Sequence, residues 1–329
     1  MERTEIGGTG VLVSKIAFGC SAIGNLYREI SEAEAHEVLR FAWDRGIRYF
    51  DTAPHYGRGL SEQRLGTFLK GRDRAAYTLS TKVGRLLSPG PDLPQADGFI
   101  NPLPMEVRYD YSGDGIEAAF EQSCERLGTS YIDIVYVHDI GRLTHGPNAR
   151  RHMDDLLGSG MERLQQLKQR GRIGAIGLGV NENEVCLEVM REVRLDVILL
   201  AGRLTLLDRS AEDALIPACR DAGTALVLGG IFNSGILATG PVPGALFDYE
   251  PATPDVREKA RRLEERAEAL GVPLASAALR FATTHPSVSS VLLGTARTRS
   301  LQRNLDALQA PAPSGLKEWF DVPSSYENS

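Results

Sequence analysis

The stretch Tyr49-Phe50-Asp51-Thr52-Ala53-Pro54-His55-Tyr56-Gly57 decides the fold. Its aromatic start is typical of a buried strand, and Pro54 and Gly57 then force the chain to turn. Asp51 and Tyr56 therefore come where the strand ends. An α/β barrel keeps its functional groups at the carboxyl ends of its strands. Taken alone, Asp51 could equally be a carboxylate that caps a loop.

Short apolar runs alternate with longer amphipathic runs on both sides of this stretch, which predicts βα units around a parallel sheet. We count eight units and expect one α/β domain over residues 1–329, a (β/α)8 TIM barrel with an N-terminal β-hairpin at 4–6 and 11–14. The expected strands are 16–19, 49–51, 78–82, 132–138, 175–180, 197–201, 225–228 and 291–294. The expected helices are 32–45, 61–70, 115–127, 161–170, 182–194, 211–221, 256–270, 274–284 and 300–308. Long strand-to-helix loops at 84–112, 139–160 and 229–255 should gather on the functional face.

The composition is that of an ordinary globular protein, with 329 residues, 42% of them hydrophobic and 24% charged. The formal charge is −6 with both signs interspersed, which argues against nucleic acid as a partner. The four cysteines are far apart and have no histidine at ligand spacing, so we expect no metal site and no disulfide framework. We expect a reduced, cytoplasmic protein without an export signal or membrane anchor.

Two further polar groups end neighbouring strands: Lys82 ends the third and His138 ends the fourth. Burying an ammonium is costly unless a counter-charge is near, so Asp51 is the natural partner of Lys82. A tyrosine beside a buried lysine should have a lowered pKa, and Tyr56 could then shuttle a proton. The plainer alternatives are a structural ion pair between Asp51 and Lys82 and a His138 that only fills the core.

At this point the chain resembles the aldo-keto reductase superfamily, whose barrel carries an Asp-Tyr-Lys-His tetrad on these strand ends. The resemblance rests on Phe50-Asp51-Thr52-Ala53 with Tyr56-Gly57, on Ser61-Glu62 with Leu65-Gly66, and on Ser80-Thr81-Lys82. Further support comes from Ser123-x-x-Arg126-Leu127-Gly128 and from Ile132-Asp133-Ile134 followed by His138. Segments such as Leu79–Arg85 are similar to the branch of D-threo-aldose 1-dehydrogenases, which includes L-fucose and pyridoxal 4-dehydrogenases.

The resemblance implies a role for each member of the tetrad. Tyr56 would be the general acid/base, Lys82 would lower its pKa, Asp51 would hold Lys82, and His138 would position the substrate oxygen. The implied reaction transfers a hydride from the anomeric carbon of an aldose or a pyridoxal hemiacetal to a nicotinamide, giving a lactone. No metal is required.

The resemblance also implies a site for NAD or NADP. The residues expected to contact the cofactor are Asn181, Gly229, Gly230, Phe232, Asn233, Ser234, Gly235, Leu237, Gly294, Thr295, Ala296, Arg297, Ser300 and Asn304. Ser300 stands where relatives usually carry an arginine for the 2′-phosphate, which favours NAD, although Arg297 and Arg299 could reach a phosphate. The expected partner is a small carbonyl or hemiacetal substrate, and the sequence leaves the oligomeric state open.

Other functions stay open at this stage. The chain could be a reductase of small aldehydes or a cofactor-binding regulatory module with little turnover. Lys82 could form a Schiff base in an aldolase-like barrel, but the apposed Asp51 would keep it protonated. Substrate hydroxyls could meet Arg85, Asp110, Tyr111 and Asp139, or these could be solvated loop residues.

Overall fold

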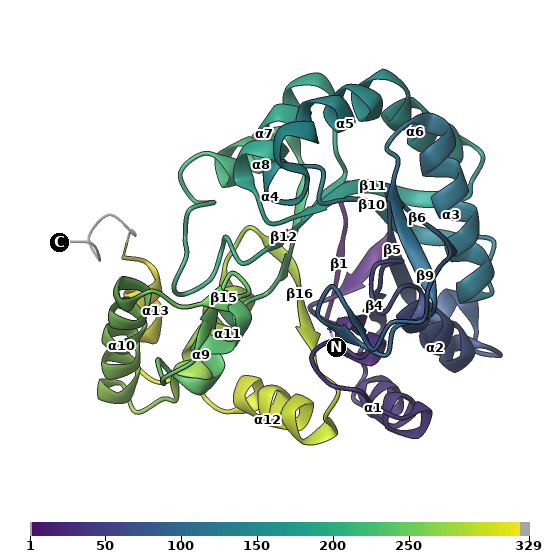
Figure 1. The fold of residues 1–329 in the computed structure, drawn as a ribbon. Helices are drawn as coiled ribbons and strands as arrows, with labels where there is room; N and C mark the ends of the chain where they lie inside the picture. The colour runs from purple at the N-terminus through teal and green to yellow at the C-terminus, as the bar shows by residue number, and fades with distance from the viewer. Residues whose placement is uncertain (1, 323–329) are drawn as a thin grey trace.

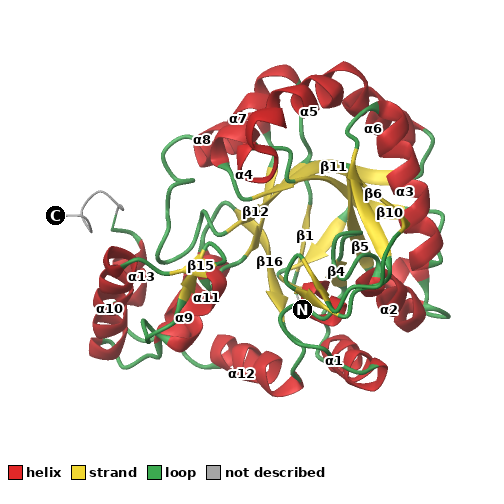
Figure 2. Cartoon of the chain, viewed as in Figure 1, coloured by secondary structure: helices red, strands yellow, loops and turns green. Residues whose placement is uncertain are grey.

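The computed structural model describes residues 2–322. Eight parallel strands form a closed barrel in which β5 pairs with β10 to complete the ring. Figure 2 shows these strands inside a layer of helices. The barrel strands are β3 (Ile16–Gly19), β4 (Tyr49–Asp51), β5 (Thr78–Val83), β10 (Ile132–His138), β11 (Ile173–Val180), β12 (Val197–Ala201), β13 (Ala225–Gly229) and β16 (Val288–Gly294). All eight predicted strands are confirmed.

The helices pack around the outside of the barrel (Figure 1). They are α1 (Glu32–Asp44), α2 (Leu60–Leu69), α3 (Gly113–Leu127), α6 (Met161–Gln169), α7 (Asn183–Glu192), α8 (Leu215–Ala222), α10 (Pro254–Ala269), α11 (Leu274–Thr284) and α12 (Thr298–Gln309). The predicted helices are confirmed, and α8 differs most because it begins at Leu215 rather than at 211. The Ser31 hydroxyl and the Glu34 side chain form the capping box that starts α1.

The barrel interior has its own small core, separate from the layer between strands and helices. The N-terminal hairpin of β1 (Arg3–Glu5) and β2 (Leu12–Ser14) was predicted and is confirmed. Ile6 and Val13 of this segment are fully buried against inward-facing strand residues such as Tyr49 and Tyr136. The hairpin therefore adds apolar side chains to the interior, whereas the cavity described below lies at the carboxyl ends of the strands.

The three long connections are more ordered than their Pro- and Gly-containing sequences suggest. The first holds the hairpins β6 (Arg85–Pro89) with β9 (Met105–Tyr109) and β7 (Gln95–Ala96) with β8 (Phe99–Ile100). The second holds α4 (Arg142–His145) and α5 (Ala149–Asp155), and the third holds α9 (Ile236–Thr239) and the hairpin β14 (Leu246–Phe247) with β15 (Glu250–Pro251). These elements are too short to show a periodicity.

The described part of the C-terminal segment ends in α13 (Leu316–Phe320). Trp319 is almost fully buried in the outer core. Residues 323–329 lie outside the described residues.

Candidate functional site

A cavity of about 750 Å³ lies at the carboxyl ends of the barrel strands. Every strand of the barrel contributes to its lining: Gly19, Asp51, Lys82, His138, Gly179, Ala201, Gly229 and Gly294. This is the end of a barrel where parallel strands bring functional groups together. The strand ends named from the sequence therefore meet at one cavity.

Asp51, Lys82 and Tyr56 form a connected group in the floor of this cavity. The Lys82 Nζ donates to Asp51 Oδ2 at 2.7 Å and to the Thr52 carbonyl oxygen at 2.9 Å, and it lies 3.1 Å from Tyr56 Oη. The side chains of Asp51 and Lys82 are each only 2% exposed. The predicted pairing of Lys82 with Asp51 is present, and the ammonium also reaches the phenol.

Hydrogen bonds from the barrel interior fix the orientation of Asp51. The Ser80 hydroxyl donates to Asp51 Oδ1 at 2.7 Å and lies 3.1 Å from Tyr49 Oη. Tyr49 Oη in turn lies 2.9 Å from Tyr136 Oη. Asp51 thus has one oxygen for Ser80 and the other for Lys82, which leaves little freedom for the carboxylate to rotate.

The electrostatics of the pair Lys82 and Tyr56 differ from the sequence-based expectation in one respect. Burial lowers the pKa of Lys82, but Asp51 and Tyr56 outweigh it, so the pKa is raised and the ammonium stays charged. Burial raises the pKa of Tyr56 to about 12, and the nearby Lys82 only partly offsets this. The expected lowering of the Tyr56 pKa is therefore wrong, because desolvation of a phenolate outweighs one neighbouring ammonium here.

His138 lies beside Tyr56 in the same cavity. Its ring stands perpendicular to that of Tyr56, with 6.2 Å between centroids, and its side chain is 7% exposed. Burial, followed by Arg85 and Lys82, lowers its pKa well below the usual value, so the imidazole is neutral near pH 7. No described residue hydrogen-bonds its Nδ1. A neutral, buried imidazole beside a phenol suits hydrogen bonding to a substrate oxygen.

The four residues proposed as substrate contacts occupy three different environments. Asp139 lines the cavity, with its Oδ2 3.3 Å from His138 Nε2. Arg85 is buried behind it and donates to the same Oδ2 at 2.6 Å. Tyr111 is fully buried and donates to the His138 carbonyl oxygen at 2.7 Å. Asp110 accepts from the amide and hydroxyl of Ser112, the cap residue of α3, so Tyr111 and Asp110 hold the scaffold.

The predicted cofactor residues divide into two groups. Those that line the cavity are Asn181, Gly229, Gly230, Phe232, Ser234, Gly235, Gly294 and Asn304. The side chains of Asn233 and Leu237 do not reach it. Asn233 is buried, lies 2.5 Å from the Thr205 hydroxyl and donates to the Gly202 carbonyl oxygen, and Leu237 is in the outer core. Thr295, Ala296, Arg297 and Ser300 lie in the segment between two lining residues, Gly294 and Asn304, but are not themselves in the lining.

The lining fits an extended ligand such as a dinucleotide. A Cβ added at Gly179 would lie 3.3 Å from the stem of Lys82, and one added at Gly230 would lie 3.2 Å from the Gly202 nitrogen. Gly230 also has a φ of +59°, which side-chain-bearing residues rarely adopt. The missing side chains keep the floor open from Tyr56 to Gly230. Asn181 would be placed to hold a carboxamide, and the backbone near Gly230 to approach a pyrophosphate.

Several lining residues were missed in the sequence. They include Ser21, which lies in a short 3-10 helix (Cys20–Gly24), and Leu26, Tyr27, Asp97, Phe99 and Tyr249, which lie in loops or short hairpins. Phe99 packs beside Tyr56 with 6.1 Å between ring centroids. No periodic pattern marks these positions, because they are brought to the cavity by the loops that carry them.

Within residues 2–322, no group of three or more His, Cys, Asp or Glu side chains is arranged to hold a metal ion. In the same residues, no helix is both long and apolar enough to cross a membrane.

Comparison with known proteins agrees with this geometry. The model of the Aldo/keto reductase family matches residues 15–314. The chain is 40% identical to a pyridoxal 4-dehydrogenase from Microbacterium luteolum, covering 92% of each chain, and 36% identical to a D-threo-aldose 1-dehydrogenase from a Pseudomonas species, covering 98% of this chain and 97% of the other. The holo form of an aldo-keto reductase from Bacillus halodurans superimposes with a TM-score of 0.76 at 27% identity, covering 97% and 95% of the two chains. The chain belongs to the Aldo/keto reductase family and is an oxidoreductase.

Proposed function

We propose that this oxidoreductase uses its nicotinamide cofactor to oxidise the hemiacetal form of an aldose or of pyridoxal to a lactone. The observation that carries the proposal is the contact of Lys82 Nζ with both Asp51 and Tyr56 Oη in the floor of the cavity. The aldose and pyridoxal dehydrogenases among its relatives support the two substrate classes.

Tyr56 is the group that moves the proton. Its Oη would accept the proton of the anomeric hydroxyl during oxidation, and Lys82 would stabilise the negative charge on the oxygen. Asp51 keeps Lys82 charged and in place. Because the pKa of Tyr56 is raised to about 12, the phenol is protonated at neutral pH, and oxidation should speed up as the pH rises.

His138 is assigned the orientation of the substrate oxygen. Bound nicotinamide supplies the acceptor for the hydride that leaves the anomeric carbon. The neutral imidazole beside Tyr56 would hydrogen-bond the same oxygen and so hold the carbon that loses the hydride. His138 itself is buried, which limits water around the oxygen that it would bind.

We assign NAD as the preferred cofactor. Asn304 lines the end of the cavity near α12, whereas no arginine among the described residues contributes to the lining. The side chains of Arg297 and Arg299 are exposed. In the sequence, Ser300 follows them and precedes Asn304, which lines the cavity. An arginine is the usual partner of a 2′-phosphate, so this lining favours the cofactor that lacks one.

The test is a screen of NAD⁺ and NADP⁺ reduction with L-fucose, D-arabinose, L-galactose and pyridoxal. We expect turnover with at least one of them, a higher kcat/KM for NAD⁺ than for NADP⁺, and a loss of roughly 100-fold or more in kcat for Tyr56→Phe. A Tyr56→Phe variant that keeps most of the turnover would refute the assignment. Tight NADH binding without turnover on the whole panel would favour the regulatory module instead.

A reductase of small aldehydes is the second candidate. It is favoured by the protonated state of Tyr56 at neutral pH, since reduction needs the phenol as a proton donor. Oxidation of NADH by small aldehydes at pH 7, faster than any lactone formation at pH 9, would make this the better description.

A further inference from the structure

Two exposed tyrosines lie at the opening of the catalytic cavity. Tyr27 is 59% exposed and Tyr249 is 60% exposed, yet both line the cavity that contains Tyr56. Burial raises the pKa of Tyr27, and Tyr249 raises it further, as expected for two phenols near the same opening. Both rings therefore lie where the wall of this cavity meets solvent.

Both tyrosines adopt a backbone conformation that disfavours them. Tyr27 has a φ of +60° and Tyr249 has a φ of +67°. Tyr249 follows Asp248, which has a φ of +50°, in the two-residue turn between β14 and β15. Such turns usually carry Asn-Gly or Asp-Gly, because glycine meets no steric cost there. An aromatic residue kept in a strained position points to a function for its side chain.

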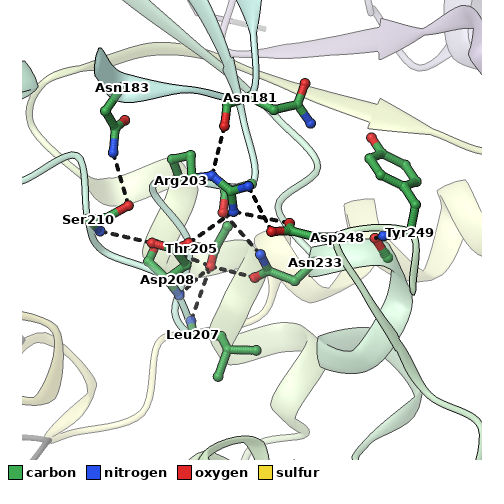
Figure 3. A network of polar contacts seen from close by, with 12 residues as sticks. Asn181, Asn183, Arg203, Thr205, Leu207, Asp208, Ser210, Asn233, Asp248 and Tyr249 are labelled. Atoms are coloured by element: carbon green, nitrogen blue, oxygen red, sulfur yellow. Dashed lines mark hydrogen bonds and ion pairs between the residues drawn. The ribbon is translucent and has the colours of Figure 1, made fainter. Parts of the chain in front are cut away.

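Ion pairing holds the turn with Tyr249 against the barrel, as Figure 3 shows. The Arg203 guanidinium binds both oxygens of Asp248, at 3.0 and 2.7 Å, and its Nε donates to the Asn181 carbonyl oxygen at 2.8 Å. The Tyr249 amide donates to the Ser234 hydroxyl at 2.9 Å. Asn181 and Ser234 line the same cavity, so Arg203 fixes the turn relative to the site.

Two carboxylates of the cavity lining already have partners within the protein. Asp139 is bound by Arg85 at 2.6 Å, and Asp97 lies 3.5 Å from Arg58. A sugar would have to compete with Arg85 and Arg58 for these carboxylates, whereas the rings of Tyr27 and Tyr249 are exposed and can pack on a flat ring.

We propose that Tyr27 and Tyr249 are specificity-determining residues that clasp a planar aromatic substrate, of the pyridoxal kind, above Tyr56. The inference rests on the proposed dehydrogenase function and selects one of its two substrate classes. Arg203 and Asp248 act through Tyr249 and are positioning residues.

The experiment measures KM and kcat for pyridoxal and L-fucose with NAD⁺, and the Kd of NADH by fluorescence, in wild type, Tyr249→Gly and Tyr27→Ala. We expect a higher kcat/KM for pyridoxal than for L-fucose in wild type. Each variant should raise the KM for pyridoxal about tenfold and change the NADH Kd less than twofold. Tyr249→Gly should also keep or raise the Tm, since glycine suits the turn. Val242→Ala, an exposed residue that precedes the same hairpin but does not line the cavity, is the matched control.

The outcomes separate the inference from the proposed function. If wild type oxidises none of the four substrates of the screen above, the proposed function fails, and the Kd of pyridoxal for the enzyme–NADH complex then tests the clasp without turnover. An unchanged pyridoxal KM or Kd in both variants overturns the inference. It is also overturned if the NADH Kd weakens as much as the KM, because the tyrosines would then cover the cofactor, or if wild type prefers L-fucose.

Discussion

At the scale of single residues, the site depends on a balance between burial and charge. The side chains of Asp51 and Lys82 are both almost fully buried, and burying either charge without the other would be costly in free energy. Burial lowers the pKa of Lys82, and the neighbouring Asp51 raises it again, so that the ammonium stays charged. The alternative of a purely structural ion pair does not account for the third contact of Lys82, which reaches Tyr56 Oη at 3.1 Å.

Removal of the Asp51 charge should change how activity depends on pH. Asp51→Asn leaves Lys82 buried without its counter-charge, so the pKa of Lys82 should fall. We expect kcat of Asp51→Asn to drop at least tenfold and to decline on the alkaline side at a lower pH than in wild type. A series of kcat values from pH 6 to 10 measures this. Ser80→Ala is the control, because it removes a hydrogen bond to Asp51 without removing a charge. Profiles of the same shape in Asp51→Asn and wild type would contradict the role of Asp51.

At the scale of secondary-structure elements, the motif residues outside the tetrad join α2 to its neighbours. Glu62 is fully buried; the Thr81 hydroxyl of β5 and the Arg126 Nε of α3 each donate to its carboxylate at 2.6 Å. Ser61 donates to the Cys20 carbonyl oxygen and bonds the Thr52 hydroxyl. These contacts fix α2, and therefore the loop with Tyr56 that precedes it.

Helix α2 lies very close to α3 at Gly66. A Cβ there would lie 2.6 Å from the Arg126 carbonyl oxygen and 2.8 Å from the Leu127 Cα, both backbone atoms of α3. Gly66→Ala should therefore lower the free energy of unfolding by roughly 1–3 kcal/mol, although alanine favours helices. Denaturant unfolding measures the change. Gly158→Ala is the control, because nothing lies within 4 Å of its Cβ position and no cost is expected. Equal stability of the two variants would argue against the close approach.

At the scale of the whole molecule, five of the six histidines are buried or partly buried in surroundings that resist protonation. Burial is the largest cause of a lowered pKa at His55, His138, His145, His152 and His285, and the pKa of His145 falls to about 4. In the unfolded chain a histidine takes up a proton near pH 6.5. Below that pH the unfolded state binds more protons than the folded state, so acid should favour unfolding.

We therefore expect the free energy of unfolding to fall as the pH drops from 7 to 5.5. Each histidine with a strongly lowered pKa should reduce the free energy of unfolding by roughly 1.4 kcal/mol for every pH unit below the pKa that it has in the unfolded chain. Urea unfolding at several pH values measures the slope. His145→Gln should make the slope shallower, because one such group is removed. A flat profile over this range would show that the histidines are not held neutral by folding.

The barrel and most of the residues in the floor of its cavity could be predicted from the sequence alone. Hydrophobic periodicity is a local property, so strands such as β4 and β10 could be predicted with their ends, and the residues at those ends followed. Asp51, Tyr56, Lys82 and His138 were found in this way because parallel strands bring their carboxyl ends together.

The opening of the cavity and the raised pKa of Tyr56 depend on contacts between distant parts of the chain. Tyr249 reaches the site because Arg203 binds Asp248, 45 residues further along the chain, and no local pattern encodes that contact. The predicted lowering of the Tyr56 pKa was wrong because burial depends on everything packed around the phenol, whereas the sequence revealed only the neighbouring lysine.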